Sequence, residues 1–309
     1  MTLNQLRTFL AVAETGSVRA AAQNLVVTQA AVSASLAALQ KSLGVALLEP
    51  DGRGLRLTPA GQAYAGYARR GLGLLEEAGR AAEAAADPER GELRVAAVTT
   101  AAEQILPGLL SSFRTRYPRL GIRLEAGNRD RVRGLLDRRQ VDLVLGGRPE
   151  PGWPVQVLAV RPHQLVVVAA PGLAATADPG DRDLSSWLAR QAWLLREPGS
   201  GTRAATDALL TELDIAPLTL MVGSNGAIRE SASVGLGVTL ISGEAVAAEL
   251  VGGRLVALPV PGTPLHRDWY LVAHPGPLSP AAGRLVAHVL ARGGFAKPRS
   301  GDANHQAKS

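Results

Sequence analysis

The chain has 309 residues, a length that favours two domains over one. Its composition is 46% hydrophobic but only 4% aromatic, so any core must consist mainly of Ala, Val and Leu. No apolar run reaches the roughly 18 residues of a membrane span, and the N-terminus lacks the basic start of a secretory signal. The absence of cysteine excludes disulfide and thiolate chemistry, and we expect a cytoplasmic protein.

The net charge of +6 is unevenly distributed. Residues 1–70 hold seven Lys or Arg and three acids, a net charge of +4, whereas residues 71–90 hold two Arg and five acids, a net charge of −3. A basic N-terminal segment followed by an acidic segment suits attraction of the first segment to phosphate. On charge alone, a chance fluctuation on a solvated surface explains the pattern equally well.

The first 58 residues predict three helices and a hairpin. Apolar residues at helical spacing indicate helices over 4–14, 18–25 and 29–41, and Ser17 and Thr28 precede the second and third of them as N-caps. In 47–58, two short strand-like runs flank the turn sequence Asp51-Gly52-Arg53-Gly54. Three helices and a hairpin form a winged helix-turn-helix, which we assign to residues 1–58.

A long helix follows over residues 59–86. Thr58-Pro59 supplies a capping hydroxyl and a proline at the first helical position, and Asp87-Pro88 ends the segment. A helix of about 28 residues spans roughly 42 Å. Its several glycines weaken it, so we expect a partner helix to stabilise it and interpret residues 59–90 as a linker and dimerisation helix.

From residue 91 onward, strand-like and helix-like runs alternate, which predicts α/β units with parallel sheets. The expected strands are 92–98, 122–126, 142–146, 165–170, 193–195, 219–222, 238–242, 255–259 and 269–273. The expected helices are 103–117, 129–138, 184–191, 202–213, 225–234, 245–250 and 281–293. The polar tail, residues 294–309, is predicted to be disordered.

Residues 3–70 resemble the DNA-binding domain of LysR-type transcriptional regulators. The likeness lies in Gly16-Ser17-Val18-Arg19-Ala20-Ala21-Ala22, in Thr28-Gln29-Ala30-Ala31-Val32-Ser33, and in Leu57-Thr58-Pro59-Ala60-Gly61. In such a domain the third helix enters the major groove of duplex DNA with its first turn. The Gln29 amide can pair with adenine, and Ser33, one turn on, can reach a phosphate or a base.

The resemblance implies DNA contacts from the second and third helices and from the hairpin, whose tip would enter a minor groove. The expected residues are Arg19, Thr28, Gln29, Ala30, Ser33, Arg53 and Arg56. The alternatives to these DNA contacts are that Gln29 is only a solvated helix residue and that Arg56 is only a surface charge. The chain departs from the family at positions 34 and 37, which usually carry arginine and are alanine here, so direct readout of bases is thinner.

Residues 91–293 resemble the LysR effector domain, a two-lobed α/β fold like that of periplasmic solute-binding proteins. This implies lobe one over 91–162 and 268–293, lobe two over 163–267, and two crossing strands near 161–164 and 266–268. The whole fold class is therefore a winged helix-turn-helix, a long linker helix and a two-lobed α/β effector domain. In α/β folds, ligands lie where strands end and helices begin.

Four segments meet that condition, and the richest is Arg196-Glu197-Pro198-Gly199-Ser200-Gly201-Thr202-Arg203. Its glycines let backbone N–H groups converge, and its hydroxyls and arginine suit a carboxylate or a phosphate. A helix cap with a surface arginine is the alternative. The expected effector residues are Thr99, Thr100, Gly147, Arg148, Ser200, Gly201, Thr202, Arg203 and Asn225. The segment also resembles the CbbR-type subgroup, in which phosphorylated metabolites or nucleotides act as effectors.

No catalytic or metal-binding constellation is expected. The five histidines lack metal-ligand spacing, Ser200 is not in a nucleophile-elbow motif, and Gly235 and Gly237 precede a strand rather than follow one, so neither an enzyme nor a cofactor is predicted. A solute-binding protein would explain only residues 91–293.

The resemblance implies duplex DNA, a small anionic effector and a homodimer or homotetramer as partners. It leaves RNA polymerase open as a further partner and implies no membrane.

Overall fold

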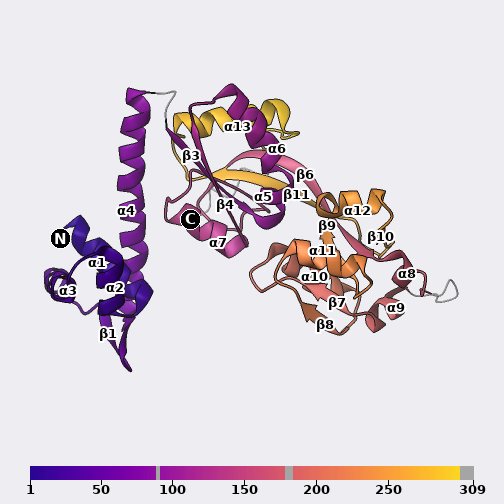
Figure 1. Cartoon of the computed structure of the whole chain (residues 1–309), viewed down its shortest axis with the longest axis horizontal. Helices are drawn as coiled ribbons and strands as arrows, with labels where there is room; N and C mark the ends of the chain where they lie inside the picture. Colours follow the sequence, from indigo (N-terminus) through magenta and orange to yellow (C-terminus); the bar gives the residue numbers. More distant parts are fainter. Residues whose placement is uncertain (88–90, 178–183, 300–309) are drawn as a thin grey trace. The chain divides into compact units, whose positions relative to one another are not determined.

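The computed structural model describes residues 1–87, 91–177 and 184–299. The chain divides into two compact units, residues 1–82 and 83–309 (Figure 1). Residues 88–90 of the expected linker and 300–309 of the expected tail lie outside the described residues. Among the described residues, no single helix is long and apolar enough to cross a membrane.

The first unit begins with the predicted winged helix-turn-helix. Its elements are α1 (Leu3–Thr15), α2 (Val18–Leu25), α3 (Gln29–Leu43), β1 (Leu48–Asp51) and β2 (Gly54–Leu57). Ser17 caps α2 by accepting from the Ala20 N–H, and Thr28 caps α3 by accepting from the Ala31 N–H. The strands β1 and β2 pair antiparallel as a hairpin. Three helices and a hairpin were expected here, and the structure confirms them.

The core of this unit lies between the three helices and the first turns of α4 (Pro59–Ala86). Phe9, Val12 and Leu39 are fully buried there, and the Phe9 ring meets Tyr64 of α4 edge-on at 5.5 Å. Gly61 permits this packing, because a Cβ at that position would lie 1.9 Å from the Leu47 carbonyl oxygen. The predicted helix over 59–86 is thus confirmed. Its first half packs into the core of the winged helix-turn-helix, and we call the two together the head.

The second unit begins with three parallel strands, which we call lobe one together with the helices that cover them. These strands are β3 (Glu92–Val98), β4 (Gly121–Gly127) and β5 (Leu143–Gly146). The covering helices are α5 (Thr99–Gln104), α6 (Leu106–Arg116), α7 (Arg129–Asp137) and α13 (Pro280–Arg292). One apolar cluster contains Phe113 and Leu285 from α6 and α13, and another contains Val132 and Leu136 from α7.

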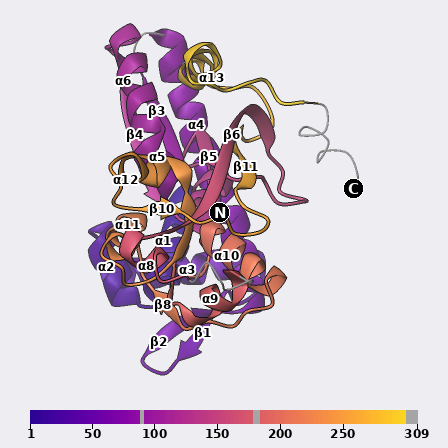
Figure 2. The same cartoon turned by 90° about the vertical axis from the view of Figure 1, so that its right-hand side faces the viewer.

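Two long antiparallel strands connect lobe one to the rest of the unit. They are β6 (Gln156–Ala169) and β11 (Leu265–Ala273), which pair from Leu265↔Leu165 to Ala273↔Gln156 and lie side by side in Figure 2. The sheet order is β10-β6-β11-β5-β3-β4, with β9 also pairing with β6. The predicted parallel pairs are thus present in both lobes, and the crossing strands add antiparallel pairs that make the large sheet mixed.

Lobe two is built on the far ends of these strands and on a small parallel sheet. Its strands are β7 (Trp193–Leu195), β8 (Thr219–Met221), β9 (Thr239–Ser242) and β10 (Val256–Ala257). Its helices are α8 (Pro171–Ala174), α9 (Leu184–Arg190), α10 (Gly201–Glu212), α11 (Asn225–Ser233), the 3-10 turn η1 (Gly243–Val246) and α12 (Ala247–Val251). Trp193 and Leu188 are fully buried at its centre.

Two further expectations need correction. The helix expected over 103–117 begins four residues earlier, at Thr99, and breaks at Ile105 into α5 and α6. The part of the tail that the structure describes is ordered, because Phe295 is buried in the lobe-one core and Ala296 exchanges two backbone hydrogen bonds with Val160. An aromatic residue in a polar context was the signal for this contact.

Candidate functional site

The candidate DNA-binding surface consists of the start of α3 and the β1–β2 hairpin. Gln29 and Ser33 are exposed on α3, while Val32 between them is buried in the head core. Thr28 holds the first turn by accepting from the Ala31 N–H at 3.2 Å. The exposed Ala30 and the exposed Arg19 of α2 complete the helical part of the predicted set.

The hairpin carries the two remaining predicted DNA contacts. Asp51 pairs with Gly54, so Gly52 and Arg53 form a two-residue turn, and Gly52 has a φ of 57° as such turns require. Arg53 is exposed in that turn. The guanidinium of Arg56 makes an ion pair of 2.6 Å with Glu49 across the hairpin. Arg53 is consequently the better placed of the two cations for a phosphate or a groove.

The candidate effector site is a pocket between the lobes, where β3 and β5 of lobe one face the start of α10 in lobe two. Its empty volume, including the part open to solvent, is about 600 Å³, a size that suits a small metabolite. Six of the nine predicted effector residues line it: Thr99, Thr100, Gly147, Ser200, Gly201 and Thr202. The predicted segments thus lie together at one pocket, and their contact with the effector stays a prediction.

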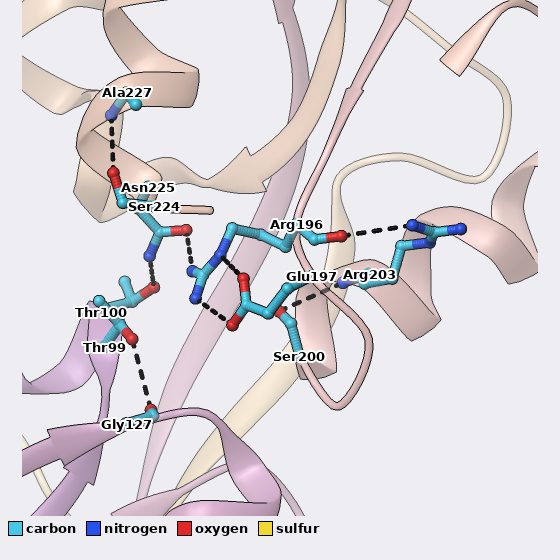
Figure 3. Close-up of polar contacts among 10 residues, drawn as sticks. All are labelled: Thr99, Thr100, Gly127, Arg196, Glu197, Ser200, Arg203, Ser224, Asn225 and Ala227. Atoms are coloured by element: carbon cyan, nitrogen blue, oxygen red, sulfur yellow. Dashed lines mark hydrogen bonds and ion pairs between the residues drawn. The ribbon is translucent and has the colours of Figure 1, made fainter. Parts of the chain in front are cut away.

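The other three predicted residues lie outside the pocket lining. Asn225 donates to the Thr100 hydroxyl at 2.7 Å and thereby links α11 of lobe two to α5 of lobe one (Figure 3). The Arg203 side chain donates to the Arg196 carbonyl at 3.3 Å (Figure 3). It also forms an ion pair of 2.9 Å with Asp207, one turn along α10. Arg148 donates to the Tyr270 hydroxyl at 3.2 Å beside a different cavity. Arg203 and Arg148 therefore do not line this pocket, and their contact with the effector stays a prediction.

Arg196, which was not among the predicted site residues, is a buried cation at the pocket wall. Only 6% of it is exposed, and it donates to both carboxylate oxygens of Glu197 at 2.7 and 2.8 Å and to Asn225 at 2.5 Å (Figure 3). Hydrogen bonds from Arg196 lower the pKa of Glu197. Because the carboxylate already balances this guanidinium, Arg196 and Asn225 form a polar support for Thr100.

Two arginines also line the pocket, Arg129 from α7 and Arg267 from β11. Arg129 contacts Glu150 at 3.6 Å. Among the described residues, Arg267 has no acidic partner within ion-pair distance. Loss of hydration and the nearby positive charge of Arg129 lower the pKa of Arg267. The pocket therefore holds positive charge that the protein itself does not fully neutralise.

His163 of β6 closes the pocket at the crossing strands. Its ring stacks on Trp269 of β11 with 4.1 Å between centroids, and its Nδ1 atom, buried without a hydrogen-bond partner, lies 3.5 Å from Glu244. Burial would raise the pKa of Glu244, but contact with His163 and Trp269 and the charge of Arg161 outweigh it, so the pKa is lowered. His163, Trp269 and Glu244 thus contact one another, and the first two line the pocket.

Sequence reasoning passed over Arg129, Arg267 and His163, although each had a signal. Arg129 begins a predicted helix directly after a predicted strand, and the other two lie in the predicted crossings. The pairing Arg267↔His163 between the crossing strands brings these residues together across 104 positions of sequence. No group of three or more His, Cys, Asp or Glu side chains that could hold a metal occurs in the part of the chain that the structure describes.

A winged helix-turn-helix followed by a two-lobed domain with a polar pocket defines a class of ligand-responsive DNA-binding regulators. Residues 3–62 match the profile of the bacterial regulatory helix-turn-helix protein, lysR family, and residues 86–294 match the profile of the LysR substrate binding domain. The chain belongs to the LysR family of transcriptional regulators, with a DNA-binding domain and an effector-binding domain.

Curated relatives and solved structures agree with this assignment. The chain is 36% identical to the HTH-type transcriptional regulator CbbR of Rhodospirillum rubrum, covering 94% of this chain and 96% of CbbR. It is 25% identical to full-length CbnR complexed with its target DNA, with a TM-score of 0.64 over 94% of this chain and 99% of CbnR. The regulatory domain of CcmR from Synechocystis, solved in complex with 2-PG, is 26% identical, with a TM-score of 0.58 over 65% of this chain and 97% of that domain.

Proposed function

We propose that this regulator responds to a small anion bound between its lobes, with Arg129 and Arg267 as the charged ligands. The observation that carries this proposal is that both arginines line one pocket and that Arg267 lacks an acidic partner within ion-pair distance among the described residues. A carboxylate or phosphate between them would remove the repulsion and receive charge-assisted hydrogen bonds from both sides.

The start of α10 supports the same ligand chemistry. Ser200 caps the helix, so the Gly201 and Thr202 N–H groups have no partner within the helix and lie at its positive end. A Cβ built on Gly201 would lie 3.7 Å from Arg129 Nη2, so the helix start and the guanidinium are close neighbours. Thr99, Thr100 and Thr202 add hydroxyl groups on the pocket wall.

The relatives give an independent reason to favour an anion. The CcmR regulatory domain binds 2-phosphoglycolate, which carries both a carboxylate and a phosphate. The mixed apolar and cationic lining, with Val98, Leu165 and Trp269 beside the arginines, suits a compact molecule of that kind. Asp268 is the acidic residue of the lining, and it disfavours an anion at its own end of the pocket.

For DNA, we propose contacts from Arg19, Thr28, Gln29, Ala30 and Ser33 and from Arg53 in the hairpin turn. Two chains would pair through α4, which places two α3 helices on a dyad-related site in the cytoplasm. Closure of the lobes on the anion would alter how the heads are spaced. Such a switch requires that the anion bind one assembly more tightly than the other.

Isothermal titration calorimetry of the full chain tests the anion site. The probes are inorganic phosphate, succinate and 2-phosphoglycolate, with uncharged ethylene glycol as the reference compound. For the anion that binds, we expect Arg267→Gln and Arg129→Gln each to weaken binding about tenfold or more, because each removes a charged hydrogen bond. Arg203→Gln is the matched control and should leave the affinity unchanged, since Arg203 is paired with Asp207 outside the pocket. Equal losses in all three variants, or no binding of any anion, would contradict the proposal.

A further inference from the structure

The outward ridge of α3 consists of alanine methyl groups. The inward face is marked by Val32, Leu36 and Leu39, which are between 0% and 6% exposed. With 100° per residue, the side chains directly opposite are those of Ala30, Ala34, Ala37 and Lys41, and all four are exposed. The surface that a recognition helix presents to a groove is therefore a row of three methyl groups ending in one lysine.

Side chains that read bases by two hydrogen bonds are nearly absent from this helix. Arg, Asn, Asp and Glu do not occur in α3. Gln40 is already occupied, because its Oε1 atom accepts from the Leu47 N–H at 2.7 Å and the Leu48 N–H at 3.3 Å. Gln29, at the first position of α3, is the remaining amide, and Lys41, at the far end of the ridge, is the one cation of the helix. The three alanine positions between them therefore offer no hydrogen-bonding partner to guanine or adenine edges.

We infer that α3 reads the 5-methyl groups of thymine, and that Ala30, Ala34 and Ala37 are the residues that determine this specificity. An alanine methyl against a thymine methyl is an apolar contact that distinguishes T from C at the same position of the groove. Short side chains also let the helix backbone approach the base edges closely. The expected operator half-site is rich in thymine at the positions that the ridge covers.

This inference deepens the DNA-binding role of the family and is independent of the proposed anion site. That role has its own support in the helix-turn-helix profile over residues 3–62 and in the likeness to CbnR bound to its target DNA. DNA is already the assigned partner of this surface. The methyl ridge determines which chemical feature of the DNA the surface contacts. A failed anion titration would leave it unaffected.

The test removes methyl groups from the DNA while keeping its base pairing. Operators are first selected with the full chain from a random duplex library, and each thymine of the enriched half-site is then replaced by deoxyuridine. We expect affinity to fall about fourfold for each contacted methyl, the effect of exposing one buried methyl group. Fluorescence anisotropy at fixed salt measures the change, because phosphate contacts respond to salt and not to this substitution.

Protein variants assign the effect to the ridge. Ala34→Gly removes one methyl from the ridge, and Ala82→Gly removes one exposed methyl from the interior of α4 with the same cost in helix propensity. We expect Ala34→Gly to bind the thymine and uracil operators equally at one position, and Ala82→Gly to retain the fourfold difference. Equal binding of both operators by the unmodified protein, or an enriched half-site without thymine under the ridge, would overturn the inference.

Discussion

Val26 is the one β-branched residue with a positive φ among the described residues. It ends α2 with a φ of 56° and a ψ of 47°, in the left-handed region, and its side chain is 90% exposed. A branched Cβ in that region costs roughly 1–2 kcal/mol of folding free energy. Because the side chain is exposed, it gains no packing energy that would offset this cost. The turn between α2 and α3 therefore carries strain that another residue type would relieve.

Val26→Asn should stabilise the head, because asparagine tolerates the left-handed conformation. We expect the unfolding free energy to rise by about 1 kcal/mol, which for a domain of this size raises its transition by about 4–8 °C. Differential scanning calorimetry of the full chain measures it as a shift of the head transition alone. Val27→Asn is the control, since Val27 has no positive φ and is 48% exposed; an equal gain there would attribute the effect to polarity.

Arg203 and Arg267 show what sequence can and cannot predict for single side chains. The segment 196–203 was correctly placed at the pocket, because a strand end, glycines and a helix cap are local features. The direction of Arg203 depends on Asp207, four residues on, which offers an ion pair away from the ligand side. Arg267 enters the pocket only because β11 pairs with β6, a contact between distant segments that no local pattern encodes.

At the scale of elements, α6 and α13 of lobe one are joined by His288. The imidazole is 7% exposed, its Nε2 atom lies 2.8 Å from the Ser112 hydroxyl, and its ring meets Phe113 edge-on at 5.6 Å. Burial, followed by the charges of Arg292 and Arg116, lowers the pKa of His288 below its ordinary value of 6.5. The neutral imidazole is therefore the form that fits between the two helices.

This arrangement predicts a loss of stability in acid. A folded pKa below the unfolded one means that the unfolded chain binds more protons, so the unfolding free energy falls as the pH drops below 6.5 toward the folded pKa. His288→Gln keeps a hydrogen-bonding partner for Ser112 but cannot titrate. Urea unfolding at about pH 7.5 and about pH 5.5 should show a smaller acid loss for the variant than for the unmodified chain. Equal losses in both would contradict the assignment.

Helices that begin with a strong N-cap were predictable from the sequence, and elements without such a local start or stop signal were not. Ser17, Thr28 and Thr58-Pro59 mark helix starts that the structure confirms within a residue. The strand β6 was expected only from 165, whereas it starts at Gln156, because Arg161, Pro162 and His163 interrupt the apolar pattern. Such polar residues are tolerated there because this part of the strand passes the pocket between the lobes. The crossing strands are hard to predict from the sequence because the polar residues that line the pocket interrupt their apolar pattern.

For the whole molecule, α4 presents an apolar stripe that the rest of the first unit leaves exposed. Tyr67 is 71% exposed and Leu74 is 50% exposed, and Gly71 and Ala78 lie in the same helical row. Tyr64 and Leu72, on another side of α4, pack against the core of the head. The exposed row is narrow enough for a second copy of α4 to pack along it.

Leu74→Glu should weaken this pairing, because it places a charge in the middle of the row. We expect analytical ultracentrifugation to show smaller assemblies, and operator affinity to fall by roughly 10- to 100-fold as the two heads bind separately. Val251→Glu, which introduces the same charge at a 92% exposed position of α12, is the control. Unchanged assembly mass for Leu74→Glu would move the dimer contact elsewhere, whereas smaller assemblies with unchanged affinity would show that a single head carries the binding energy. Only loss of both properties together fits a regulator whose two recognition helices act on one site through α4.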